Sequence, residues 1–160
     1  MGTRREARER AVQFLFQHDL NPPDDVGAAL DRFWESHRAA ALEAETTGAT
    51  WGQLPPLPPP SPTETAVRLF ADPLIRGTLQ HRDEIDAQIR RIAKNWELHR
   101  IAVVDRNILR LAIFEMLHRE DIPPVVSIND AIDIAKQFST EESGTFVNAP
   151  LDHTQVKILR

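Results

Sequence analysis

The chain has 160 residues, a formal net charge of −5 and no cysteine. This length suits one domain with a substantial core and is short for two. The lack of cysteine excludes disulfides and thiolate metal sites, which suits a reducing cytosol. The charged N-terminus has no apolar signal segment, and no apolar run reaches the length of a membrane span. We therefore expect one soluble, cytoplasmic domain covering residues 1–160.

The first twenty residues have the apolar spacing of an amphipathic helix. Four apolar residues at i, i+4, i+7 and i+8 share one face: Ala7, Ala11, Phe14 and Leu15. This helix should end at Asn21, because a residue that precedes proline is pushed out of the α region. A second helix is predicted to start near Asp24 or Asp25, whose carboxylates suit a helix N-terminus, and to run into residues 39–45.

A proline-rich segment separates this helical pair from the rest of the chain. Six of the twelve prolines lie in residues 55–62, where they favour polyproline II and cannot continue a helix. We predict that residues 46–63 form a semi-rigid surface loop, which Trp51 could anchor to the domain. A proline-motif ligand for an aromatic groove is the alternative reading of the same composition.

Helical spacing resumes after the loop. Residues 63–79 include the apolar Leu69, Phe70 and Leu74, with Pro73 expected to kink or split the helix unless it lies in a first turn. A following helix presents one apolar face at i, i+4, i+7 and i+11: Ile85, Ile89, Ile92 and Trp96.

The segment 103–118 is apolar around most of its circumference, which is typical of the central helix of a bundle. A turn at Asp121 and two prolines follows. The spacing of Ser127 and Asp130 fits a capping box at the start of the next helix, and Thr140 would cap a last one. Together these elements predict an all-α bundle of about seven helices.

The sequence contains no recognisable catalytic or cofactor motif. The six histidines never adopt the spacing of a local zinc site, and the six glycines form no phosphate-binding loop. We therefore predict no metal, no cofactor and no enzymatic activity. An enzyme assembled by the fold from scattered histidines remains an alternative.

Arginines crowd the start of the first helix, at Arg4, Arg5 and Arg8. Positive charge there opposes the helix dipole, so the placement is unusual. A solvated charged end is one explanation. A guanidinium patch for phosphate is the other, because the planar forks suit bidentate contact.

Three strings closely resemble the NusB family of bacterial transcription antitermination factors: "RREARERAVQFLFQ", "NWELHRIAVVDRNILRLAIFEML" and "DIPPVVSINDAIDIAKQFSTEESGTFVN". The resemblance implies a two-lobed, all-helical fold that binds boxA, a short single-stranded RNA element of leader and ribosomal RNA transcripts. It also implies joint binding with a small-subunit ribosomal protein that doubles as an elongation factor, and action on the RNA polymerase elongation complex. The acidic net charge suits joint binding, since such a chain should bind RNA weakly alone.

The resemblance assigns roles to seven residues. It places Arg4, Arg5 and Arg8 in an RNA-binding segment, Glu142 and Phe146 near the RNA path, and Phe16 and Asp105 where the family meets its protein partner. An exposed Phe146 would stack on an unpaired base, typically worth about 1–3 kcal/mol, whereas Glu142 near phosphate would limit affinity. From the residues alone, either phenylalanine could be core and Asp105 a helix cap.

Two departures from the family pattern fall near the C-terminus. Thr145 stands where the family commonly has lysine, which removes a phosphate contact, and Pro150 would kink the last helix. Two other functions remain open: a helical interaction module without RNA binding, and a stand-alone relative of the N-terminal module of ribosomal RNA 5-methylcytosine methyltransferases. A homodimer is also possible.

Overall fold

The computed structural model describes residues 2–45, 57–92 and 101–138, and these contain six helices and no strand. The helices are α1 (Thr3–Leu20), α2 (Val26–Glu45), α3 (Pro62–Gln80), α4 (Arg82–Ile92), α5 (Val103–His118) and α6 (Pro124–Phe138). The predicted all-α class is confirmed. The expected helix after Thr140 and the loop residue Trp51 lie outside the described residues. Within those residues, no helix combines the length and apolar character needed to cross a membrane.

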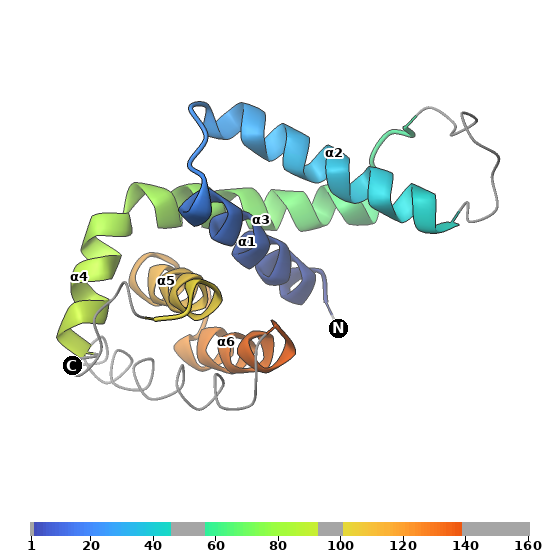
Figure 1. The fold of residues 1–160 in the computed structure, drawn as a ribbon. Coiled ribbons are helices and arrows are strands. Elements are labelled where there is room, and N and C mark those ends of the chain that lie inside the picture. Colours follow the sequence, from blue (N-terminus) through green and yellow to red (C-terminus); the bar gives the residue numbers. More distant parts are fainter. Residues whose placement is uncertain (1, 46–56, 93–100, 139–160) are drawn as a thin grey trace.

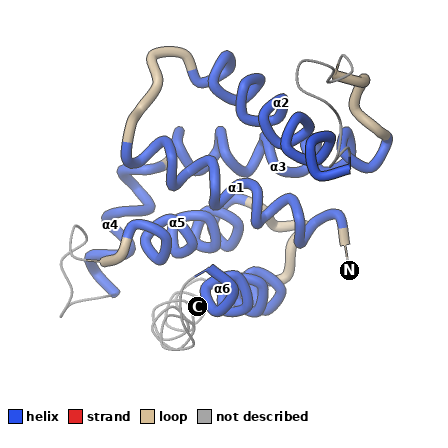
Figure 2. Tube along the Cα trace, turned by 45° about the vertical axis from the view of Figure 1, so that its right-hand side comes forward, coloured by secondary structure: helices blue, strands red, loops and turns tan. Residues whose placement is uncertain are grey.

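Helix α5 lies at the centre of the arrangement (Figure 1). It contacts α1, α3, α4 and α6, and α1 in turn packs most extensively on α3. Helix α2 runs along the outer side of the α1 and α3 pair, while α6 lies beneath α5 (Figure 2). The described helices share one hydrophobic core cluster.

The central position of α5 follows from its composition. Residues 107–116 are all buried, and Ile108, Leu109 and Ile113 are almost completely enclosed. A helix that is apolar on nearly all sides has no face to offer solvent, so neighbours must cover its whole circumference. The predicted central helix is thus confirmed.

Aromatic side chains attach α2 to the rest of the protein. The rings of Phe14 and Phe33 meet edge to face with centroids 5.4 Å apart, and Phe33 and Trp34 do so at 5.3 Å. The Trp34 Nε1–H group donates to Asp72 Oδ1 at 2.9 Å, which satisfies its one polar atom. Such contacts combine large apolar area with a fixed geometry.

Helix starts follow local capping chemistry, with two corrections to the predicted bounds. Asp25 accepts from the Ala28 N–H at 3.2 Å, so a carboxylate begins α2 as predicted. Ser61 accepts from the Glu64 N–H at 3.1 Å and caps α3, which therefore starts inside the segment assigned to the loop. Pro73 lies within α3 and does not split it.

The predicted capping box at Ser127 is wrong. Helix α6 already begins at Pro124, because proline suits the first helical position. Ser127 is therefore inside the helix and buried, and its Oγ–H donates to Glu115 Oε1 at 3.1 Å. Asp130 faces α1 and pairs with Arg8. Ser127 and Asp130 therefore make tertiary contacts with α5 and α1 and do not cap the helix.

The close approach of α3 and α5 depends on Gly77. A Cβ atom at this position would overlap the Phe114 ring. We expect Gly77→Ala to lower the free energy of unfolding by about 1–3 kcal/mol, the usual cost of overpacking a filled core. Chemical denaturation followed by circular dichroism measures this difference.

Gly27→Ala is the matched control, since the nearest atoms to its new Cβ would be 3.4 Å away. Alanine exceeds glycine in helix propensity by roughly 0.8–1 kcal/mol, so this variant should be no less stable than the wild type. Equal losses in the two variants would show that the Phe114 contact is not the cause.

Candidate nucleic-acid interface

The first turns of α1 present arginines in three different environments. Arg4 is exposed, Arg5 is half-buried, and Arg8 is only 3% exposed. Gly2 precedes the helix without any side-chain cap. The three arginines at this helix end therefore have different roles, which depend on the residues that surround each of them.

Arg8 forms a buried ion pair that ties α1 to α5 and α6. Its Nε donates to both carboxylate oxygens of Glu115 at 3.0 Å, and its Nη2 donates to Glu115 Oε1 at 2.8 Å. Its Nη1 donates to Asp130 Oδ2 at 2.7 Å. Burial alone would lower the pKa of Arg8, but the hydrogen bonds and charges of Glu115 and Asp130 outweigh it and raise the pKa above its ordinary value.

The geometry corrects the interpretation of Arg8 as a free guanidinium for phosphate. Its donors are already engaged by carboxylates, and displacing them would leave Glu115, which is 1% exposed, as an unpaired buried charge. Arg8 therefore holds the end of α1 in place.

Arg5 is held more loosely. Its Nη1 lies 3.5 Å from Asp130 Oδ1 and 3.3 Å from Asp133 Oδ2, and its Nε lies 3.7 Å from Glu9 Oε1. Partly exposed pairs at such distances contribute little and are screened by salt. The Arg5 guanidinium can exchange these partners for another anion at small cost.

Three guanidinium groups surround the Phe70 ring, and we call this set the arginine–Phe70 cluster. The ring centroid lies 4.9 Å from Arg4 Cζ, 5.3 Å from Arg8 Cζ and 5.4 Å from Arg119 Cζ. All three distances lie within the range of a cation–π interaction. Arg119 also donates to both oxygens of Asp121 at 3.0 Å, and these bonds raise its pKa despite partial burial.

Nothing in the sequence indicates that Phe70 and Arg119 belong to this cluster. Phe70 resembled an ordinary apolar helix residue, and Arg119 lies in a turn far from the N-terminal arginines. No local spacing connects them, because the cluster joins α1, α3 and the end of α5.

The remaining predicted site residues lie elsewhere. Phe16 is half-buried on α1. Asp105 is buried in the first turn of α5, where Ala102 and not Asp105 is the N-cap residue, so the capping interpretation is wrong. Glu142, Phe146, Thr145 and Pro150 lie outside the described residues.

A second ion network holds the other end of α1. Asp19 Oδ2 accepts from Arg106 Nη2 at 2.7 Å, from Arg110 Nη1 at 2.9 Å and from Asn107 at 3.1 Å. Arg110 also donates to both oxygens of Asp86 on α4. Burial would raise the pKa of Asp19, but these donors outweigh it and the pKa is lowered.

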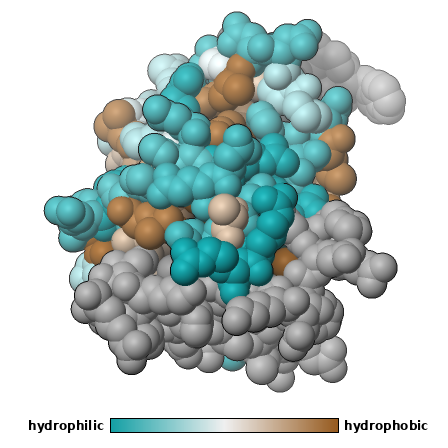
Figure 3. All heavy atoms as spheres, turned by 90° about the vertical axis from the view of Figure 1, so that its left-hand side faces the viewer, coloured by the Kyte–Doolittle hydropathy of each residue, from teal (hydrophilic) through white to brown (hydrophobic). Residues whose placement is uncertain are grey.

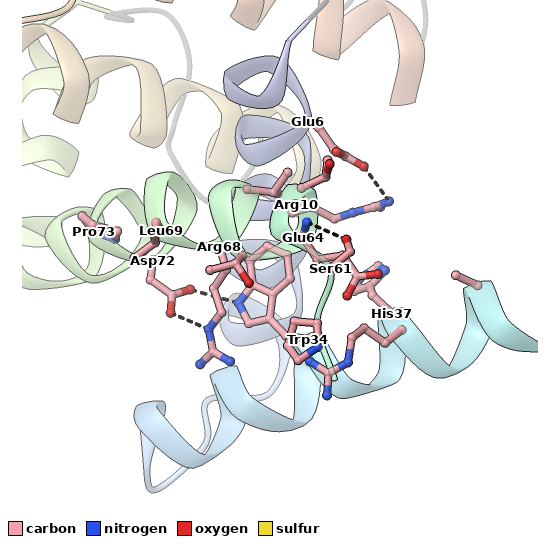
Figure 4. Close-up of a pocket in the computed structure, with 16 residues that line it drawn as sticks. Glu6, Arg10, Trp34, His37, Ser61, Glu64, Arg68, Leu69, Asp72 and Pro73 are labelled. Carbon is pink, nitrogen blue, oxygen red and sulfur yellow. Dashed lines mark hydrogen bonds and ion pairs between the residues drawn. The ribbon is translucent and has the colours of Figure 1, made fainter. Parts of the chain in front are cut away.

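A hollow of about 650 Å³ lies between α2 and α3, beside Trp34 (Figure 4). Leu69 is one of the lining residues, and it is 71% exposed. The close-up shows Asp72 accepting from both Trp34 and Arg68, and Arg10 paired with Glu6. These side chains are thus engaged with polar neighbours in the protein.

The fold and the arginine–Phe70 cluster define a small all-helical protein that presents cationic and aromatic groups at one helix end. The NusB family model matches residues 5–155. The transcription antitermination protein NusB of Myxococcus xanthus is 40% identical over 158 residues, covering 99% of this chain and 98% of its own length. That of Geobacter sulfurreducens is 41% identical over 152 residues, covering 95% and 93%. The chain belongs to the NusB family.

Solved structures share the fold. The NusB of T. maritima is 32% identical with a TM-score of 0.71, covering 96% of this chain and 91% of its own. A chain in the crystal structure of the antitermination factors NusB and NusE with double-stranded RNA is 24% identical with a TM-score of 0.69, covering 98% of each chain. The predicted family and fold are thus confirmed.

Removing one member of the Arg8–Glu115 pair should lower the free energy of unfolding far more than removing both. Arg8→Met leaves Glu115 charged and unpaired, and we expect a loss of about 3–5 kcal/mol in the free energy of unfolding. Arg8→Met combined with Glu115→Leu should recover most of that loss, because no buried charge is then left alone. Urea denaturation of the three proteins measures the effect.

Arg10→Met is the control for this comparison. Arg10 lies on the same helix and pairs with Glu6 at 3.8 Å across partly exposed surface, so its loss should cost less than about 1 kcal/mol. A double variant no more stable than Arg8→Met would contradict the assignment of the loss to an unpaired charge.

The Asp19 network should make the free energy of unfolding depend on pH in the acid range. A carboxyl with a lowered folded pKa stabilises the fold above its unfolded pKa, and the contribution is lost as the pH falls through the folded pKa. Asp19→Asn should therefore be less stable than the wild type at neutral pH, with a gap that narrows in acid. Denaturation series from neutral to acid pH measure the gap, and a constant gap would contradict the proposed linkage.

Proposed function

We propose that this protein is a transcription antitermination factor that binds single-stranded, boxA-like RNA jointly with a small-subunit ribosomal protein. The proposal rests on the start of α1, where Arg4 lies over the Phe70 ring, Arg5 lies beside carboxylates of α6, and the buried Arg8 holds the helix in place. Family membership and the names of the relatives support the same function.

The end of α1 supplies the two contacts that single-stranded RNA requires. Exposed guanidinium groups attract the phosphate backbone, and the positive end of the helix dipole adds to that attraction. Arg4 lies against Phe70, so its side chain is partly ordered before RNA arrives, which reduces the entropy lost on binding. Arg5 exchanges its loose carboxylate partners for phosphate. Arg8 acts indirectly, by positioning both.

The protein partner supplies affinity that this acidic chain lacks. With a net charge of −5, the cluster alone should hold RNA weakly. We propose that Phe16 and the start of α5, which includes Asp105, form the partner surface, and that Phe146 and Glu142 flank the RNA. The solved complex of NusB and NusE with RNA supports a joint mode for that protein. The complex would then act on elongating RNA polymerase in the cytoplasm, by binding and without catalysis.

A helical interaction module without RNA binding is the second candidate. The observation that favours it is the engagement of Arg8 and Arg5 with carboxylates of α5 and α6, which accounts for part of the arginine enrichment structurally. Measurement of RNA binding separates the two candidates.

Fluorescence anisotropy with a labelled boxA-like RNA and a scrambled control tests the proposal, with and without the ribosomal protein. We expect tight, sequence-selective binding only with the partner present. Arg4→Ala and Arg5→Ala should each weaken RNA binding. In a plot of the logarithm of the association constant against the logarithm of the salt concentration, each lost phosphate contact should reduce the steepness of the slope by roughly 0.7. Phe70→Leu should weaken binding through the loss of the ring that orders Arg4.

Arg32→Ala is the matched control. Arg32 is an exposed arginine of α2 that lies near Gln17 and Leu20 at the C-terminal end of α1, away from the arginines at the start of that helix. The RNA affinity of this variant should equal that of the wild type. Absence of selective binding even with the partner, or equal losses in Arg5→Ala and Arg32→Ala, would refute the proposed interface and leave the interaction module.

A further inference from the structure

Three potential metal ligands from different elements meet at one corner of the fold. His81 ends α3, Glu84 lies in the first turn of α4, and His118 is the last residue of α5. One ligand atom from each lies within 4.8 Å of the others. This is a separate place from the arginine–Phe70 cluster and has no part in the proposed RNA contact.

Each histidine nitrogen lies farther from the Glu84 carboxylate than a short hydrogen bond requires, at about the separation of two ligand atoms on one ion. Glu84 Oε2 lies 3.4 Å from His81 Nδ1, and Glu84 Oε1 lies 3.4 Å from His118 Nε2. Ligand atoms around a tetrahedral zinc with bonds of roughly 2.0–2.2 Å are about 3.3 Å apart. A charge-assisted hydrogen bond would instead be about 2.7–2.9 Å long.

The two imidazole rings stack face to face. Their centroids are 4.0 Å apart with planes 21° from parallel, and the Phe114 ring stacks beside His118 at 5.4 Å. Nearly parallel rings cannot both direct a lone pair at one ion, so one ring must turn about its terminal side-chain torsion. That torsion is broad, and the His118 side chain is 29% exposed, which leaves room for the turn.

Arg82, which lies between His81 and Glu84 in the sequence, directs its charge away from the cluster. Arg82 directs its guanidinium to Asp19, at 3.4 Å, and to Asp86, at 3.9 Å. Arg82 therefore does not occupy the Glu84 carboxylate. On the side of the protein where α4 lies, the described surface is mostly hydrophilic, with several apolar patches among it (Figure 3).

We propose that His81, Glu84 and His118 bind a divalent transition-metal ion, with zinc favoured by two imidazoles and one carboxylate. Water would complete the coordination. The ion would join the corner between α3 and α4 to the end of α5. The sequence has no local histidine motif and so predicts no metal site, whereas the fold brings these three residues together.

Zinc titration of chelator-treated protein against a chromophoric competitor tests the proposal. We expect one zinc per chain, and a rise in Tm that EDTA reverses, because a ligand of the folded state stabilises it by mass action. Glu84→Gln and His118→Ala should each weaken binding on the order of 10–100-fold, at least the loss known for changes around metal ligands. Circular dichroism verifies that each variant folds.

Asp83→Asn is the matched control, since it removes an equal charge from the neighbouring exposed carboxylate outside the cluster. Its zinc affinity should match that of the wild type. No zinc binding by the wild type, or equal binding by the wild type and both cluster variants, overturns the proposal. A loss in only one of Glu84→Gln and His118→Ala overturns the three-ligand site.

Discussion

The buried contact between the Arg8 guanidinium and the Glu115 carboxylate determines how the N-terminal helix sits on the rest of the protein. It joins α1 to the central helix, and Ser127 and Asp130 extend it to α6. A buried ion pair adds little net stability over an apolar pair of the same shape, but leaving one partner alone is strongly unfavourable. The contact therefore selects one position of α1 by penalising the others.

The surface chemistry of the helix end follows from that position. Arg4 precedes Arg8 by four residues and lies over Phe70, whereas Arg5 precedes it by three and lies over α6. Helix geometry links these directions, so a rotation of α1 that freed Arg8 would also move Arg4 off the ring. A buried residue with no access to ligand thus controls where the exposed cations stand.

Local pattern predicted the parts of the structure that depend on local physics. Apolar spacing identified α1 and the central α5, and the carboxylates before α2 predicted its start. The failures concern contacts between distant segments. Nothing in the sequence near Arg8 distinguishes it from Arg5, because Glu115 decides its burial.

Ser127 and the pair His81 and His118 illustrate the same limit. Ser127 and Asp130 have capping-box spacing, but the proline at position 124 starts the helix earlier and frees both side chains for α1 and α5. The histidines lie on different helices, so a search for local metal motifs passes over them. Family resemblance indicated the function, which spacing could not, yet it did not separate exposed arginines from buried ones.

Charge placement on α1 explains why its docking and its folding are coupled. Arg4 and Arg5 stand at its positive dipole end and Asp19 at its negative end, so both ends oppose the dipole by some tenths of a kcal/mol per charge. An isolated helix with this pattern is weakened. Tertiary contacts compensate these charges: Asp130 and Asp133 of α6 lie beside Arg5 at the start, and Arg106 and Arg110 of α5 pair with Asp19 at the end. Helix α1 is therefore more stable when it is packed on α5 and α6 than when it is isolated. The cationic end that the proposed RNA contact needs thus forms together with the core.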